Sequence, residues 1–414
     1  MFDRSLINPM MTGEELNNAL RIIPKYYDSI RTKDKSTRLV ALSELYNIYI
    51  PSRMSEEIYS KLYLSLLRSL NKKDTINAVR QENENYKAVK QMSYQGIIGG
   101  SDSFTIIGCS GIGKSSAISR AVDLITDKTF VEFNNTKICP VAVVQCPFDS
   151  SVKGLAFEIL RKIDDALETK YYTNAIRSHA TTDILIGIIS QVALNHIGLM
   201  IIDEIQNVAS SKNGKTFIHA ITQLINNSGI SICMVGTPEC KVFFEQKLQL
   251  ARRSMGLCYQ PLEFNDYFIH FCRTMFNYQY TQKKTDLTEG LIEWLYEHSG
   301  GLVSLVVSLF HDAQEIAIMN CSEEVNISTL TEAFEKRISM LHSFISQDQR
   351  KLHTSSVKSS KKRLSIKPTQ ATHNLDFSVT EVIEISRKNG INAVDVLKQY
   401  CPIEEIPAGG DSPC

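Results

Sequence analysis

The sequence predicts an α/β fold in which helices flank a parallel sheet, followed by a helical lid. Between residues 101 and 260, short apolar runs alternate with helical segments, a pattern typical of a parallel sheet covered on both faces. From about residue 261 the apolar periodicity is helical only, and residues 1–100 also have a mostly helical pattern. With 414 residues the chain is long for a single core, which indicates two or three domains.

Composition fits a soluble globular protein, with 43% hydrophobic and 22% charged residues. Basic and acidic residues both number 45, so any basic surface for nucleic acid must be local. The ten cysteines form no C-x-x-C pair, which favours reduced thiols in a cytosolic protein over a disulfide framework. The N-terminus lacks the apolar region of a signal peptide, and the apolar runs are shorter than a membrane span, so no membrane partner is expected.

The helices expected in chain order begin with an amphipathic helix at 58–70, for which packing against the next domain is favoured over a partner-binding face. A crossover helix is expected at 182–197, with Thr181 or Thr182 as its cap. In the lid, Thr329 and Glu332 have the spacing of a capping box. The expected strands are 104–107, 141–145, 199–202 and 230–235, and the expected lid helices are 287–298, 302–319 and 326–344.

The C-terminal part begins with a basic, serine-rich stretch at 351–367, which has six Lys or Arg residues and no acid. Its composition is that of a flexible linker, or of a tether for a partner or nucleic acid. Two short helices are expected beyond it, at 379–388 and 393–400. We therefore expect a helical N-terminal region for partner binding or packing (1–85), an α/β core (86–262), a lid (263–345) and a basic linker with a short helical tail for partner docking (346–414).

A glycine-rich loop, GCSGIGKS, follows the first expected strand and matches G-x-x-x-x-G-K-[ST]. Its glycines allow successive backbone N–H groups to point at phosphate oxygens, and the following helix adds its positive end. Lys114 is predicted to reach the β- and γ-phosphates and Ser115 to ligate Mg²⁺. Chance would give such a match on the order of one time in a hundred, and the flanking strand and helix argue further against chance. The predicted nucleotide-binding residues are Gly108, Cys109, Ser110, Gly111, Ile112, Gly113, Lys114, Ser115 and Ser116.

Two acids, Asp203 and Glu204, follow the apolar run 199–202. In a parallel sheet they lie at the carboxyl edge, beside the glycine-rich loop. Asp203 is predicted to hold Mg²⁺ together with Ser115, and Glu204 to orient and deprotonate the attacking water. An acid after a strand is common, but its pairing with the phosphate loop makes the signal specific and indicates hydrolysis.

Two further polar groups complete the predicted catalytic set. Thr237 follows the last expected strand, where it is predicted to sense the γ-phosphate or to position water; the alternative is a turn hydroxyl before Pro238. Arg252 and Arg253 precede a short strand, where one of them could reach the γ-phosphate of a neighbouring subunit; a solvated basic turn is the alternative.

These elements, in this order and followed by a helical lid, resemble the P-loop NTPases of the AAA+ class. The runs PFDSSVKGL, ILRKID, LMIIDEIQN, MVGTPEC and LARRS are moreover similar to the TnsC/TniB family, the target-selection regulators of bacterial transposons, over residues 100–310. One departure lies in SGGLVS (299–304), which lacks the arginine that AAA+ lids often place there. Cys109 is also unusual within such a loop and could be sensitive to oxidation.

The resemblance implies ATP and Mg²⁺ as cofactors and an ATPase that is not a nuclease. It implies a homo-oligomer, a ring or a helical filament, on double-stranded DNA in the bacterial cytoplasm. A target-selection protein of the TniQ or TnsD type would recruit it, it would recruit transposase subunits, as in CRISPR-associated transposons, and hydrolysis would disassemble it. Lys153 in the family-like loop, and Thr173 and Arg177 after it, are expected to contact DNA phosphates.

Two alternatives stay open on the sequence. One is another AAA+ DNA-associated ATPase, of the initiator or helicase-loader type, although the segment after 345 is short for the winged helix that initiators usually append. The other is a signalling NTPase switch that works without DNA, although residues 1–100 are small for a sensor domain.

Overall fold

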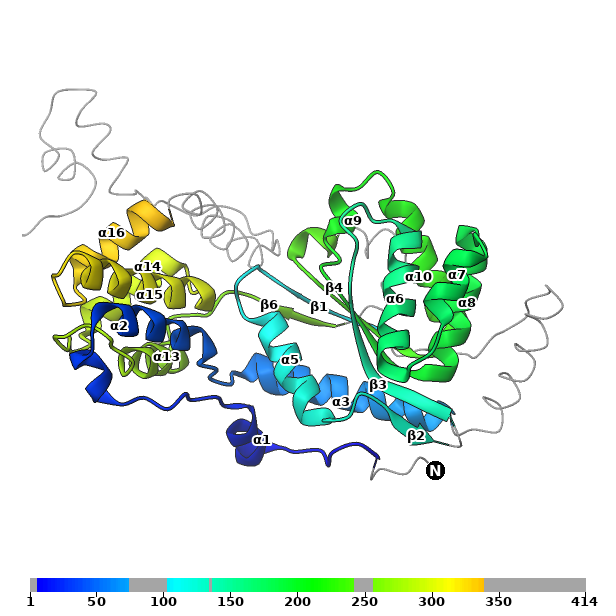
Figure 1. Ribbon diagram of the computed structural model, residues 1–414, viewed down its shortest axis with the longest axis horizontal. Coiled ribbons are helices and arrows are strands. Elements are labelled where there is room, and N and C mark those ends of the chain that lie inside the picture. The colour runs from blue at the N-terminus through cyan, green and yellow to red at the C-terminus, as the bar shows by residue number, and fades with distance from the viewer. Residues whose placement is uncertain (1–5, 74–102, 134–135, 242–255, 339–414) are drawn as a thin grey trace, which may run out of the picture. The chain divides into compact units, whose positions relative to one another are not determined.

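The computed structural model describes residues 6–73, 103–133, 136–241 and 256–338 (Figure 1). The chain divides into two units, Met1–Leu352 and His353–Cys414, and every described residue lies in the first. The arginine pair at 252 and 253, the basic stretch at 351–367 and the two helices expected beyond it lie outside the described residues, so these expectations stay predictions. The expected domain boundaries stay predictions as well.

A six-stranded sheet with the order β2-β3-β4-β5-β1-β6 forms the centre of the fold (Figure 1). Only β2 runs antiparallel to its neighbour; the other pairs are parallel, as the sequence predicted. The third strand begins five residues before its predicted start at 141, because its first residues pair with β2 rather than continuing an apolar run. The strands are β1 (Phe104–Gly108), β2 (Val131–Phe133), β3 (Thr136–Gln145), β4 (Ile197–Asp203), β5 (Ser231–Gly236) and β6 (Leu257–Tyr259).

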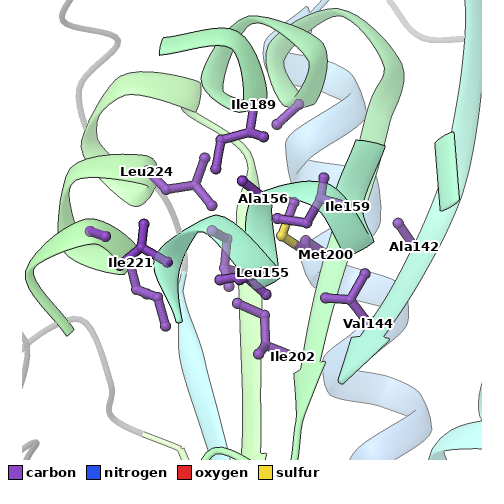
Figure 2. Close-up of a cluster of buried hydrophobic side chains, with 14 of the residues drawn as sticks. Ala142, Val144, Leu155, Ala156, Ile159, Ile189, Met200, Ile202, Ile221 and Leu224 are labelled. Carbon is purple, nitrogen blue, oxygen red and sulfur yellow. The ribbon is translucent and has the colours of Figure 1, made fainter. Parts of the chain in front are cut away.

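Side chains alternate between the two faces of the sheet, and helices bury both faces. In β4, Met200 and Ile202 point into one apolar cluster, whereas Leu199 and Ile201 belong to the other. Figure 2 shows the first cluster, in which Met200 and Ile202 meet residues of α6, α8 and α10. The helices on this face are α6 (Val152–Leu167), α7 (Tyr171–Arg177), α8 (Thr182–His196), α9 (Asn207–Ser210) and α10 (Gly214–Ser228).

The opposite face is covered by α1 (Gly13–Leu20), α3 (Arg53–Lys73) and α5 (Lys114–Ile125). The predicted amphipathic helix at 58–70 is the middle of α3, and its apolar residues are buried against strands and α5. The structure therefore confirms the favoured interpretation, that this helix packs within the fold. The N-terminal helices thus complete the layer that covers the sheet.

The lid consists of α13 (Asp266–Phe276), α14 (Glu289–Ser299), α15 (Val303–Met319) and α16 (Ile327–Arg337), so helices follow the sheet as predicted. The expected cap at Thr329 was wrong: Asn326 caps α16, and Thr329 is the third helical residue of that capping box. Asparagine is at least as good a cap as threonine, and the helix begins directly after it, close to the expected start at 326. Thr181 precedes α8, but its side chain makes no capping hydrogen bond.

Residues 21–52, which we call the strap, connect α1 to α3 and pack against the lid. The strap contains α2 (Lys35–Ala41) and two 3₁₀ turns, η2 (Asp28–Thr32) and η3 (Leu42–Asn47). Its buried residues Leu42, Leu45 and Ile48 share one cluster with residues of all four lid helices. The N-terminal region therefore contacts the sheet through α1 and α3 and the lid through the strap.

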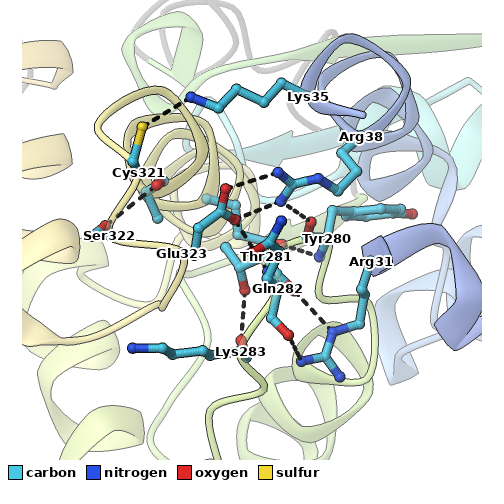
Figure 3. Close-up of polar contacts among 12 residues, drawn as sticks. Arg31, Lys35, Arg38, Tyr280, Thr281, Gln282, Lys283, Cys321, Ser322 and Glu323 are labelled. Carbon is cyan, nitrogen blue, oxygen red and sulfur yellow. Dashed lines mark hydrogen bonds and ion pairs between the residues drawn. The ribbon is translucent and has the colours of Figure 1, made fainter. Parts of the chain in front are cut away.

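A buried ion pair joins the strap to the lid (Figure 3). Arg38, with 1% of its surface exposed, donates to Glu323 through Nη1 and Nη2 at 2.6 and 2.8 Å. Nη1 also donates to the Tyr280 carbonyl at 3.1 Å, and Gln282 N donates to the Glu323 carboxylate at 3.2 Å. The hydrogen bonds from Arg38 hold the pKa of Glu323 below its usual range.

We expect Arg38→Met to destabilise the protein by about 3–5 kcal/mol, because it leaves the Glu323 carboxylate buried without its partner. The double variant Arg38→Met/Glu323→Leu removes both charges and should recover most of that loss. Urea unfolding followed by circular dichroism measures both. A double variant as unstable as the single one would show that Arg38 acts through its other contacts.

No helix in the described part of the chain is by itself long and apolar enough to cross a membrane. Only α14 and α15 taken together, bent by 118°, reach that length and composition.

Candidate nucleotide-binding site

The glycine-rich loop connects β1 to α5, as predicted. Gly111 and Gly113 have φ angles of +83° and +96°, in a region that side chains disfavour, so the loop needs glycine at both positions. The helix α5 begins at Lys114, directly after the loop, and its free N–H groups face the same space. The backbone therefore has the shape of an anion cradle.

Lys114 is buried and folds back onto its own loop. Its Nζ donates to the carbonyls of Gly108 and Cys109 at 2.6 and 2.8 Å. Burial lowers the pKa of Lys114, and the carboxylate of Asp203 partly offsets that effect. An incoming phosphate would supply the negative charge that this buried ammonium lacks.

Ser115 and Asp203 converge from two different elements. Ser115 Oγ, in the first turn of α5, donates to Asp203 Oδ2 at the end of β4 at 3.2 Å. A hydroxyl and a carboxylate oxygen are hard donors of the kind that Mg²⁺ prefers, so this pair fits the predicted metal. When bound, the metal would neutralise charge on the phosphates, and these two residues would hold it.

Glu204 adopts a left-handed backbone conformation, with φ of +59°. This conformation costs a non-glycine residue about 1–2 kcal/mol, and such strain is often found at functional sites. Two contacts hold the residue: its N–H donates to Asp203 Oδ1 at 2.8 Å, and Gln206 Nε2 donates to its carboxylate. The side chain is exposed towards the cavity, as a base for water needs to be.

Thr237 follows β5 and lines the same cavity. Its hydroxyl donates to the carboxylate of Glu239, two residues on, and its carbonyl accepts from Cys240 Sγ at 2.8 Å. Burial raises the pKa of the Cys240 thiol to about 11. Thr237 therefore lies where the sequence predicted, whereas its role at the γ-phosphate stays a prediction.

A cavity of about 780 Å³ contains these residues and has the size of a ligand pocket. The loop with the ends of β4 and β5, the end of β6 and the start of α3 line it, together with a wall made by the strap and the lid. That wall includes Tyr49 and Ile50 of the strap and Tyr267 and Val307 of the lid. These four residues could not be predicted from the sequence, because their place depends on how the strap crosses the lid.

The lid contacts the phosphate loop through Ser304, in the run SGGLVS, which lacks the arginine that AAA+ lids often have there. Ser304 N donates to the Gly111 carbonyl at 3.1 Å. A Cβ on Gly111 would come within 2.3 Å of Ser304 Oγ, so glycine is needed here for space as well. Sequence reasoning missed this contact, and likewise Gln206 beside Glu204. The run SGGLVS was the only signal for Ser304.

The three predicted DNA residues lie on two helices that pack together, α6 and α7. Lys153 is exposed in the first turn of α6, and its ammonium lies 5.6 Å from the centroid of the Phe157 ring. Thr173 and Arg177 are exposed on α7, which is tied to the far end of α6 by the Asp164 carboxylate. The Tyr172 ring of α7 also lies 5.7 Å from the Phe157 ring, so α7 meets the part of α6 that carries Lys153. Their contact with DNA stays a prediction.

Residues 99–257 match the model of a family described as bacterial TniB protein. The matched segment contains the phosphate loop, Asp203, Glu204 and Thr237, which the structure brings together in one cavity. This part of the chain is TniB-like. The predicted resemblance to the TniB family is thereby confirmed, and the TniB-like segment supplies the phosphate loop and the acids of the candidate nucleotide site.

Solved structures similar to the chain include two ORC proteins and a replication initiation protein, and no curated protein matches it. The Aeropyrum pernix ORC1 protein in complex with DNA has a TM-score of 0.39 and 14% identity over 61% of this chain and 64% of its own. The A. pernix ORC2 protein (ADPNP-ADP complexes) has a TM-score of 0.40 and 15% identity, and the match covers 78% of each chain. Domain III of the Thermotoga maritima replication initiation protein DnaA has a TM-score of 0.36 and 12% identity, and the match covers 63% of this chain and 92% of that domain. The chain thus spans less than two thirds of the ORC1 chain.

Proposed function

We propose that this protein is an ATP-dependent regulator of DNA transposition, which assembles on double-stranded target DNA and disassembles when it hydrolyses ATP. One observation carries the proposal: Lys114, Ser115, Asp203 and Glu204 meet at one cavity within a TniB-like segment. In this role the protein links a target-selection protein of the TniQ or TnsD type to transposase subunits. It does not cut DNA itself.

The chemistry proposed for the site is hydrolysis of the γ-phosphate. Lys114 leaves the carbonyls of Gly108 and Cys109 and binds phosphate oxygens, while the N–H groups of the loop hold the others. Glu204, oriented by Gln206, accepts the proton of the attacking water. Ser115 and Asp203 hold Mg²⁺.

Assembly follows from the position of the cavity and from the predicted arginine finger. If Arg252 or Arg253 of one subunit binds the γ-phosphate held by its neighbour, ATP stabilises the contact between subunits and ADP does not. Nucleotide state then sets the affinity of subunits for one another. An assembly then binds DNA more tightly than a single subunit does, because many weak phosphate contacts act together along it.

Electron microscopy of the full chain with linear duplex DNA tests the proposal. We expect rings or filaments that enclose the duplex with ATP and with a non-hydrolysable analogue, and none without nucleotide. The ATP assemblies should disappear as ATP is consumed, whereas the analogue assemblies persist. Oligomers that form with ATP but ignore DNA would support the signalling switch instead and would overturn the proposal.

A further inference from the structure

The most exposed large apolar side chain in the described part of the chain is Phe148, with 86% of its surface open to solvent. It lies in the loop of residues 146–151, which joins β3 to α6 at the carboxyl edge of the sheet. A phenyl ring in that position is unfavourable in the free protein because its apolar surface faces water. Nothing described in the nucleotide site uses it.

The loop holds Phe148 outward in a fixed conformation. Ser150 N donates to the Pro147 carbonyl at 2.9 Å, which closes a turn with Phe148 at its second position. The Asp149 carboxylate accepts from Ser151 N at 3.0 Å, and Ser150 has a φ of +50°. Because the loop is ordered before any partner arrives, little conformational entropy would be lost on binding.

A second loop is tied to the first and carries positive charge. Ser211 Oγ and Asn213 Nδ2 donate to the Asp149 carbonyl at 2.9 and 3.3 Å, so the segment between α9 and α10 lies against the 146–151 loop (Figure 1). Lys212 of this segment and Lys215 in the first turn of α10 are exposed. Together with Lys153 they give the two tied stretches, residues 146–153 and 211–215, three lysines and one acid, Asp149.

We propose that Phe148 and these lysines form one surface for duplex DNA, in which the lysines contact phosphates and the ring packs against sugars and bases in the minor groove. The charge favours DNA over an apolar protein face, and a projecting phenylalanine is a known form of minor-groove wedge. The inference rests on the proposed function. It adds Phe148, Lys212 and Lys215 to the predicted contact at Lys153.

The surface is also bonded to the end of β4. Cys146 N donates to the Asp203 carbonyl at 2.8 Å, and Asn207 Nδ2 donates to the Cys146 carbonyl at 3.0 Å. Asp203 and Asn207 flank Glu204 in the chain. The proposed surface is therefore joined by direct hydrogen bonds to the backbone that carries the hydrolytic residues.

Fluorescence anisotropy of labelled duplex DNA with the full chain and a non-hydrolysable ATP analogue tests the surface. We expect Phe148→Ala to weaken binding about tenfold or more, and Phe148→Trp to keep it, because tryptophan retains an aromatic wedge. Lys212→Ala/Lys215→Ala should lower the slope of log affinity against log salt by about one for each lysine. All substituted side chains are exposed, so folding is preserved.

Matched controls use exposed residues elsewhere: Val40→Ala on α2, and Lys128→Ala/Lys284→Ala. They should bind DNA like the unaltered protein. If Phe148→Ala and Lys212→Ala/Lys215→Ala bind DNA as tightly as these controls, the proposed DNA surface is wrong while the proposed function stands. If Phe148→Ala loses nucleotide-dependent assembly in the absence of DNA, the ring contacts another subunit, and the surface is overturned as well. If the unaltered protein binds no duplex, the proposed function itself fails.

Discussion

Replacing Lys114 by alanine should abolish nucleotide-dependent assembly on DNA. Lys114 is the only lysine that the described structure places within the phosphate loop, and its Nζ lies within the loop at 2.6 Å from the Gly108 carbonyl. Without its charge, the β- and γ-phosphates lose their main cationic partner. We expect ATP affinity to fall by at least about a hundredfold, an effect of about 2.7 kcal/mol. Titration with a fluorescent ATP analogue measures it.

The same substitution should not destabilise the nucleotide-free protein. Burial lowers the pKa of Lys114 in the folded state, so the unfolded chain binds its proton more strongly. Below the folded pKa the charged lysine therefore opposes folding, and alanine removes that cost. A thermal midpoint for Lys114→Ala that is equal to or above that of the unaltered protein supports this account. A lower midpoint would indicate a structural role for Nζ, and loss of assembly would then not report on nucleotide alone.

The second large effect is expected for Glu204→Gln, which should bind ATP and assemble on DNA but hydrolyse ATP about a hundredfold or more slowly. Glutamine keeps the size and the contact with Gln206 but cannot accept a proton. Assemblies formed with ATP should therefore persist as they do with a non-hydrolysable analogue. Phosphate release and light scattering, followed in the same sample, measure both effects.

Glu132→Gln provides the matched control, because Glu132 is an exposed carboxylate on β2, at the edge of the sheet opposite to β6. It should hydrolyse ATP and disassemble like the unaltered protein. If Glu204→Gln disassembled at that same rate, Glu204 would not be the base. Asp203→Asn would then be the next variant to measure.

Much of the nucleotide site could be predicted from the sequence because its residues follow strands directly. The ends of parallel strands meet at one edge, so Ser115, Asp203 and Thr237 had to lie close together once the strands were recognised. The spacing within GCSGIGKS likewise requires a loop between a strand and a helix. These signals are local, and the structure reproduces them.

The partners of those residues could not be predicted, because they come from parts of the chain distant in sequence. Gln206 beside Glu204 and Ser304 against Gly111 depend on side-chain and lid positions that no spacing encodes. The start of β3 was missed because it depends on pairing with β2. The α16 cap was missed because two residues that can cap a helix, Asn326 and Thr329, lie three positions apart.

The parallel strands, the phosphate loop, the acids at the edge of the sheet and the helical lid could all be predicted from the sequence, since each follows from periodicity or from a motif with fixed geometry. Packing alone shows that the strap lies on the lid through Arg38 and Glu323 and closes one wall of the cavity. Packing also leaves Phe148 exposed in a loop that is bonded to the segment carrying Lys212. Both depend on contacts between distant segments, whose free energy exists only once the whole chain has packed.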